Sequence, residues 1–214
     1  MTALPNANLL NPLVISALMA AATTAAVGLA VPPPESDTVA RLAERLVHNP
    51  FVLGIGFAGI WALAYGLLQL WATGAPGASG LAGWIMGTGP ATEPVFPGDT
   101  TLAAGLFAER WDYLAARRMA PMAYAVWLLP LLGFIGTVIG ISDAIGGLGT
   151  VFAEQDRQEA LEAVLGALRF AFDTTFAGLV LVIPVMALST LIGLADARAR
   201  DRAIGVRFAP SEKA

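Results

Sequence analysis

The chain has 214 residues, of which 57% are hydrophobic and only 13% are charged, with a formal net charge of −4 at pH 7. A soluble core of this size does not need so much apolar surface, so the composition indicates an integral membrane protein. Cysteine is absent and His48 is the single histidine, which excludes disulfides and argues against a zinc site or other metal site built by the chain alone. The acidic balance and scattered arginines also argue against a nucleic-acid-binding surface.

Four stretches are long and apolar enough to cross a bilayer, which takes roughly 20 residues. They cover approximately residues 9–31, 51–72, 122–141 and 170–194, and none has a charged side chain near its middle. No Lys or Arg precedes the first stretch, so it lacks the charged start of a signal peptide and is predicted to be a true span. We therefore expect an all-α membrane protein with four transmembrane helices that extend beyond the membrane.

The links between the spans also carry readable patterns. Ser36 or Asp37 can cap a short amphipathic helix that stops before Pro50, and we expect this helix to lie on the outer membrane surface. Residues 73–98 are rich in glycine and proline and predict no long regular element. From Asp99 a helix can start and run directly into the third span, whose prolines would be first-turn or kink positions.

The placement of basic residues sets the expected orientation. Arg110, Arg117 and Arg118 precede the third span, and a basic tail follows the fourth. By the positive-inside rule both segments, and therefore both termini, are predicted to lie in the cytoplasm. The tail contains Arg198, Arg200, Arg202, Arg207 and Lys213.

The third and fourth spans carry small and hydroxylated residues where a lipid-facing helix would carry leucine. Steps of three and four residues place these side chains on one face of each helix. Two such faces can pack closely against each other or line a cavity. The faces consist of Gly133, Thr137, Gly140 and Ala144 in the third span, and of Ala171, Thr175, Gly178, Val182, Val185 and Ser189 in the fourth.

Two motifs on these adjacent spans occur in a fixed order. The first reads Pro130-Leu-Leu-Gly-x-x-Gly-Thr137-Val-x-Gly140, and the second reads Thr175-x-x-Gly178-Leu-x-x-x-Ile-Pro184. Together they resemble the MotA/TolQ/ExbB proton-channel family, whereas either motif alone would be a weak signal. The resemblance covers about residues 120–195.

That resemblance implies a multi-pass subunit of the bacterial inner membrane, with no cofactor. Such subunits form a ring, usually a homopentamer, around the single transmembrane helices of an ExbD/TolR/MotB-like partner, here expected in two copies, which supplies the essential membrane aspartate. By the same matching, Thr137 and Thr175 face the ion pathway, and Pro130 and Pro184 shape the helices. Thr174 is a second candidate hydroxyl, although Thr175 fits the face and the motif better. The glycines expected in helix packing are Gly133, Gly136, Gly140 and Gly178.

Two acids lie at the expected outer ends of these spans. Asp143 and Asp173 could concentrate protons at the outer mouth of an ion pathway. Asp173 also lies four residues after Arg169, so a helix-surface ion pair or a helix cap explains it equally well. The sequence leaves both readings open.

The chain also departs from the family. Members of the ExbB and TolQ type have three spans and a long cytoplasmic insertion, whereas four spans and a short link are expected here, a layout closer to MotA. The link is too small for a large torque-generating domain, so an envelope energiser or a non-flagellar stator is favoured. The predicted parts are a two-span hairpin (residues 1–72), a cytoplasmic link and amphipathic helix (73–120), a channel core (121–195) and a basic cytoplasmic tail (196–214).

The leading functional hypothesis is a proton-channel subunit that couples inward proton flow to mechanical work in the envelope. The alternative is a non-conducting scaffold whose small-residue faces only pack. A self-sufficient transporter is disfavoured because no acid or base lies near the middle of a span. An enzyme is disfavoured because no nucleophile and base can be identified.

Overall fold

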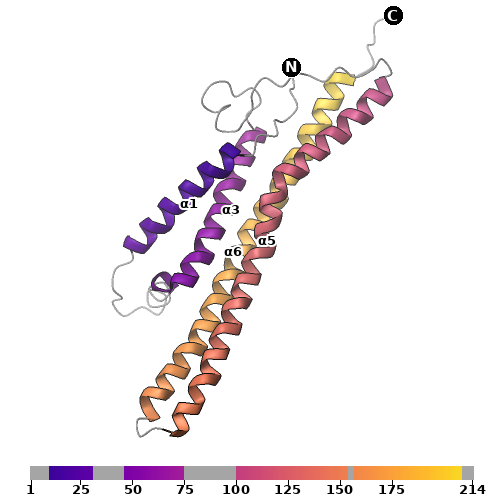
Figure 1. Cartoon of the computed structure of the whole chain (residues 1–214). Coiled ribbons are helices and arrows are strands. Elements are labelled where there is room, and N and C mark those ends of the chain that lie inside the picture. Colours follow the sequence, from indigo (N-terminus) through magenta and orange to yellow (C-terminus); the bar gives the residue numbers. More distant parts are fainter. Residues whose placement is uncertain (1–9, 31–45, 75–99, 154–156, 209–214) are drawn as a thin grey trace, which may run out of the picture. The chain divides into compact units, whose positions relative to one another are not determined.

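The computed structural model of the protein describes residues 10–30, 46–74, 100–153 and 157–208. Within these residues the regular structure is entirely helical, without any strand, and four long helices make up nearly all of it (Figure 1). The all-α class expected from the sequence is therefore confirmed.

The four helices differ greatly in length. Helix α1 spans Leu10–Ala30 and α3 spans Pro50–Gly74, with 21 and 25 residues. Helix α5 spans Thr100–Ala153 and α6 spans Arg157–Phe208, with 54 and 52 residues. At 1.5 Å per residue the last two are each about 80 Å long, so they extend far beyond a hydrocarbon core of about 30 Å.

Three of these helices are long and apolar enough to cross a membrane. The qualifying segments are Pro50–Trp71, Thr101–Gly149 and Arg157–Gly205, whereas the apolar part of α1, Asn11–Val27, is shorter. Three membrane-crossing helices are thus consistent with the sequence prediction. A fourth span formed by α1 and the cytoplasmic position of both termini stay predictions.

The start of α3 follows from its sequence. The side-chain oxygen Oδ1 of Asn49 accepts hydrogen bonds from the backbone N–H groups of Phe51 and Val52, at 3.0 and 3.4 Å. Asn49 is therefore the helix cap, and Pro50 occupies the first helical position, where its missing N–H costs nothing. The capped helix begins within one residue of the predicted start of the second span.

Two predicted links fall largely outside the described residues. Of the expected surface helix only Leu46, Val47 and His48 are described, and these three are helical. The glycine- and proline-rich link is described only at its first two residues. The helix expected from Asp99 does begin at Thr100 and continues without a break into the third span, as predicted.

Contacts divide the chain into two compact units, and each long helix contributes to both. The first, called the ion-pair unit below, comprises residues 1–18, 63–123 and 187–214. The second, called the threonine unit, comprises residues 19–62 and 124–186. In each unit the packed stretches of α5 and α6 run antiparallel (Figure 1).

Helix α3 uses a glycine to approach its neighbours in each unit. In the threonine unit a Cβ added to Gly59 would lie 3.0 Å from the side chain of Leu181 on α6. In the ion-pair unit a Cβ added to Gly66 would lie 2.6 Å from Leu188 and 2.9 Å from Met122. Larger residues at these positions would push α3 away.

An aromatic cluster in the ion-pair unit joins the beginning of α5 to the end of α6. Phe107, Trp111 and Ala203 are buried together, and the Phe208 ring packs 5.9 Å from that of Phe107. These contacts bury apolar surface outside the uncharged stretches of both helices. Within this unit they bring the first turns of α5 against the last turns of α6.

Candidate functional site

A pair of threonine hydroxyls joins α5 to α6 in the threonine unit. The Oγ1 atoms of Thr137 and Thr175 are hydrogen-bonded to each other, and either can be the donor. Thr137 can instead donate to the carbonyl oxygens of Gly133 and Ala171, and Thr175 to that of Gly133, each at 3.2 Å. Because each hydroxyl has one proton, these bonds are alternatives, and the pair can reverse its direction of donation.

Three glycines allow the two helices to come this close. A Cβ added to Gly178 would lie 2.6 Å from the carbonyl oxygen of Leu129, and one added to Gly140 would lie 2.6 Å from that of Ala167. A Cβ on Gly133 would lie 3.1 Å from the Thr175 Cα. Close approach of helices through small residues is the usual mode of packing in membranes. The predicted faces of both spans therefore meet each other.

Thr174 has a different environment from the other two threonines. It is fully buried, and its hydroxyl donates to the carbonyl oxygens of Ala171 and Phe170 at 2.9 and 3.1 Å. Its Cβ would lie 2.5 Å from a Cβ added to Gly136. The structure thus seals Thr174 within the helix interface, whereas Thr137 and Thr175 are both partly exposed.

The partly exposed side of the threonine pair faces away from α3. On a helix that turns about 100° per residue, Leu181 lies about 120° from Thr175 in one direction, and it is Leu181 that contacts α3. Phe172 and Leu179 lie about 40–60° from Thr175 in the other direction and are 75% and 50% exposed. The pair can therefore be approached from the face opposite α3.

Two motif prolines flank the pair within unbroken helices. Pro130 lies two turns before Thr137 on α5, and Pro184 lies inside α6, nine residues after Thr175. Each proline lacks the N–H that would bond to the carbonyl four residues earlier. Both helices are therefore locally weakened close to the threonine pair.

The two acids proposed for an outer mouth do not lie beside the threonines. Asp143 is exposed, and on an ideal helix it lies about 120° around α5 from Thr137. Asp173 is half-buried and lies about 160° around α6 from Thr175. The described residues also contain no group of three or more His, Cys, Asp or Glu side chains that could hold a metal ion.

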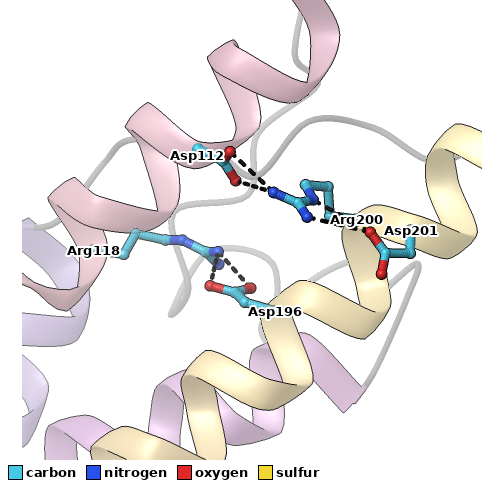
Figure 2. Close-up of polar contacts among 5 residues, drawn as sticks. All are labelled: Asp112, Arg118, Asp196, Arg200 and Asp201. Carbon is cyan, nitrogen blue, oxygen red and sulfur yellow. Dashed lines mark hydrogen bonds and ion pairs between the residues drawn. The ribbon is translucent and has the colours of Figure 1, made fainter. Parts of the chain in front are cut away.

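A buried ion pair in the ion-pair unit was not recognised in the sequence. Arg118 Nη2 donates to both carboxylate oxygens of Asp196, at 2.8 and 2.9 Å, and both residues are more than nine-tenths buried (Figure 2). The hydroxyl of the fully buried Tyr65 on α3 donates to the Arg118 carbonyl oxygen at 2.8 Å. Helices α3, α5 and α6 therefore meet at Arg118. The sequence had suggested only that this arginine helps to orient the chain in the membrane.

A second ion pair links the same two helices at the surface. Arg200 Nη1 donates to both carboxylate oxygens of Asp112, at 2.9 and 3.0 Å, and Arg200 also lies 3.4 Å from Asp201 (Figure 2). Here α5 supplies the acid and α6 the base, whereas α5 supplies the base in the buried pair. Which residue of α6 pairs with Arg118 or with Asp112 depends on the register of the two helices, so the sequence could not identify either ion pair.

Comparison with known families supports the motif-based resemblance. Residues 108–200 match the family model described as the MotA/TolQ/ExbB proton channel family. No curated protein and no solved structure matches the chain. The matched residues include the threonine pair, both motif prolines and both ion pairs. The resemblance inferred from the two motifs is confirmed, and the match begins further toward the N-terminus than the motifs do.

Proposed function

We propose that this chain, whose residues 108–200 form a domain of the MotA/TolQ/ExbB proton channel family, is the proton-channel subunit of an ion-driven stator or energiser complex. The family match supports a membrane protein with an ion-channel role. The ring, the partner and the coupling to mechanical work are the proposed part. Residues on the face opposite α3 would line the ion pathway.

The threonine pair is the observation that carries this proposal. A carboxyl group that gains and loses a proton inside a membrane needs a hydrogen-bond acceptor when neutral and a donor when ionised. Thr137 and Thr175 can supply either, because one hydroxyl can turn from a carbonyl oxygen toward an incoming group while the other donates to it. The carbonyl oxygens that lose this bond keep their helical N–H partners.

The titrating group must come from another chain. No charged residue occurs between Arg118 and Asp143 on α5, or between Asp173 and Asp196 on α6. A single-span partner that carries a membrane carboxylate would complete the pathway. In the proposed complex, five copies of this chain surround two partner helices in a bacterial inner membrane. Each proton crossing inward at about 100 mV releases about 2.3 kcal/mol, which relative movement of ring and partner could use.

The alternative function is a non-conducting scaffold, and the close α5–α6 packing favours it. The glycines of both motifs serve this packing within one chain, so the motifs have a structural role even without conduction. A scaffold needs the glycines but not the partly exposed hydroxyls. Substitutions of the glycines and of the hydroxyls therefore distinguish the two functions.

Native mass spectrometry and proton flux test the proposed function. The chain is expressed with and without a candidate single-span partner that carries a membrane carboxylate, purified in detergent and reconstituted in vesicles carrying an internal pH dye. We expect five copies with two copies of the partner, and proton uptake that requires the partner. A monomer or dimer that ignores the partner and conducts no protons would contradict the proposal and favour the scaffold.

A further inference from the structure

A second polar site lies on the exposed surface of α5 in the ion-pair unit. The guanidinium carbons of Arg110 and Arg117 each lie 5.9 Å from the centre of the Tyr113 ring. The three residues follow one another by steps of three and four, so they share one helix face. All three are exposed, and Tyr113 is 55% exposed. The Tyr113 ring thus lies beside two positive charges, one from the turn before it and one from the turn after it.

These two charges have no ion-pair partner in the described part of the chain. The nearby carboxylates are engaged elsewhere, because Asp112 binds Arg200 and Asp196 binds Arg118 (Figure 2). Glu109, adjacent to Arg110, is exposed and forms no ion pair with a described residue. Two guanidinium groups beside one exposed ring give this helix face two positive charges, and both attract an anion that binds at the ring.

The chemistry and position of these residues fit a phosphate group. Guanidinium groups bind phosphate oxygens through paired N–H donors, and the Tyr113 hydroxyl can add a third donor. Tyr113 lies six residues, or about 9 Å, before the uncharged stretch of α5 that starts at Met119. Headgroup layers add about 5–8 Å on each side of the hydrocarbon core, so long arginine side chains at this level reach lipid phosphates.

We propose that Arg110, Tyr113 and Arg117 form a binding site for a phosphate group, carried by an anionic phospholipid headgroup or by a soluble phosphate. The site belongs to the ion-pair unit and shares no residue with the threonine pair or with the two ion pairs between α5 and α6. It therefore does not depend on ion conduction.

The test compares three forms of the full chain in nanodiscs. They are the wild type, the double variant Arg110→Gln/Arg117→Gln, and the control Arg157→Gln/Arg169→Gln, which removes the same charge from two exposed arginines near the start of α6. Native mass spectrometry counts phosphatidylglycerol molecules retained from discs that also contain phosphatidylcholine. We expect the double variant to lose retained phosphatidylglycerol by about fivefold or more, and the control to match the wild type.

Titration with inorganic phosphate distinguishes the two sources. If phosphate raises the melting temperature of the wild type and the control but not of the double variant, while phosphatidylglycerol is retained equally by all three, the ligand is a soluble phosphate. If all three forms respond alike to both probes, the proposal is overturned, and an acidic protein partner would become the explanation for the exposed arginines.

Discussion

At the scale of single residues, exposure separates three threonines that look alike in the sequence. Thr137 and Thr175 are partly exposed and bond to each other, whereas the neighbouring Thr174 is fully buried against Gly136. All three hydroxyls find acceptors in or between the helices. Only the partly exposed Thr137 and Thr175 can also reach a group outside the chain, so the three substitutions to valine should differ in effect.

Replacing either threonine of the pair with valine should reduce proton flux. Valine has the shape of threonine but no hydroxyl, so Thr137→Val or Thr175→Val should cost only about 0.5–1.5 kcal/mol of stability. We expect partner-dependent proton uptake to fall at least tenfold while the complex still assembles. Loss of a side chain that takes part in proton transfer typically has an effect of this size or larger. The control is Thr23→Val, since Thr23 on α1 donates to the Met19 carbonyl oxygen of its own helix. Unchanged flux in both variants would refute the role of the pair.

The buried threonine provides a second test at this scale. Thr174→Val keeps the contact with Gly136 and removes a hydroxyl that bonds only to carbonyl oxygens of its own helix. We expect proton uptake within about twofold of the wild type, because the lost bonds are of modest strength and do not face the pathway. A loss as large as that of Thr175→Val would place Thr174 in the pathway too.

At the scale of the helices, small residues and ion pairs fix how α5 and α6 meet. The glycines set the distance between the helices, because carbonyl oxygens of one helix occupy the space where side chains of the other would be. The ion pairs favour one register of the two helices. Because α5 supplies the base of one pair and the acid of the other, sliding α6 along α5 would place Arg200 near Arg118 or Asp196 near Asp112. The role of the glycines and that of the ion pairs can each be tested by comparison with a control position in α5 or α6.

Gly178→Ala should destabilise the helix pair, whereas Gly193→Ala should not. The new Cβ at Gly178 would lie 2.6 Å from the Leu129 carbonyl oxygen, but nothing lies within 4 Å of one at Gly193. We expect a loss of about 1–3 kcal/mol at Gly178 from overpacking, and a gain of up to about 1 kcal/mol at Gly193 from better helix propensity. Denaturation in mixed micelles, followed by circular dichroism, measures both. Equal effects would contradict the observed helix approach.

Breaking the buried ion pair should cost more than breaking the exposed one. Arg118→Met leaves the Asp196 carboxylate buried without its partner, for which about 3–5 kcal/mol is expected, while Asp112→Asn at the surface should cost about 1 kcal/mol or less. Removing both buried charges, as Arg118→Met/Asp196→Leu, should recover most of the loss. The same micelle denaturation assay tests this, and a double variant less stable than Arg118→Met would contradict it.

At the scale of the whole molecule, the predicted topology can be tested directly because the chain contains no cysteine. A single cysteine at Arg202 or at Gly149, both exposed, should react from opposite sides of the membrane. The positive-inside rule predicts that Arg202→Cys is labelled from the cytoplasm and Gly149→Cys from outside. Reaction of both variants with an impermeant maleimide in intact cells would contradict this orientation.

The sequence alone was sufficient for the helical class, for the faces of α5 and α6 that meet, and for the resemblance of residues 108–200 to the MotA/TolQ/ExbB proton channel family. These depend on local quantities, namely the length of uncharged stretches, the period of small residues and the order of two motifs. A helix that starts from Asp99 and runs into the third span was also predicted, and the observed helix begins at Thr100. The capping of α3 by Asn49 is also a local feature, because an asparagine cap followed by proline at the first helical position is typical of helix starts.

Only the tertiary structure decided which side chains meet and which stay accessible. The period of α6 places Thr175 on a face, but α5 packing determines that Thr174 is sealed while Thr175 remains reachable. Likewise, Arg118 and Asp196 are 78 positions apart, and neither local sequence indicates that they form a buried ion pair or that the Tyr65 hydroxyl donates to the Arg118 carbonyl oxygen. Such contacts depend on the register of two long antiparallel helices, a non-local property that periodicity within one helix does not contain.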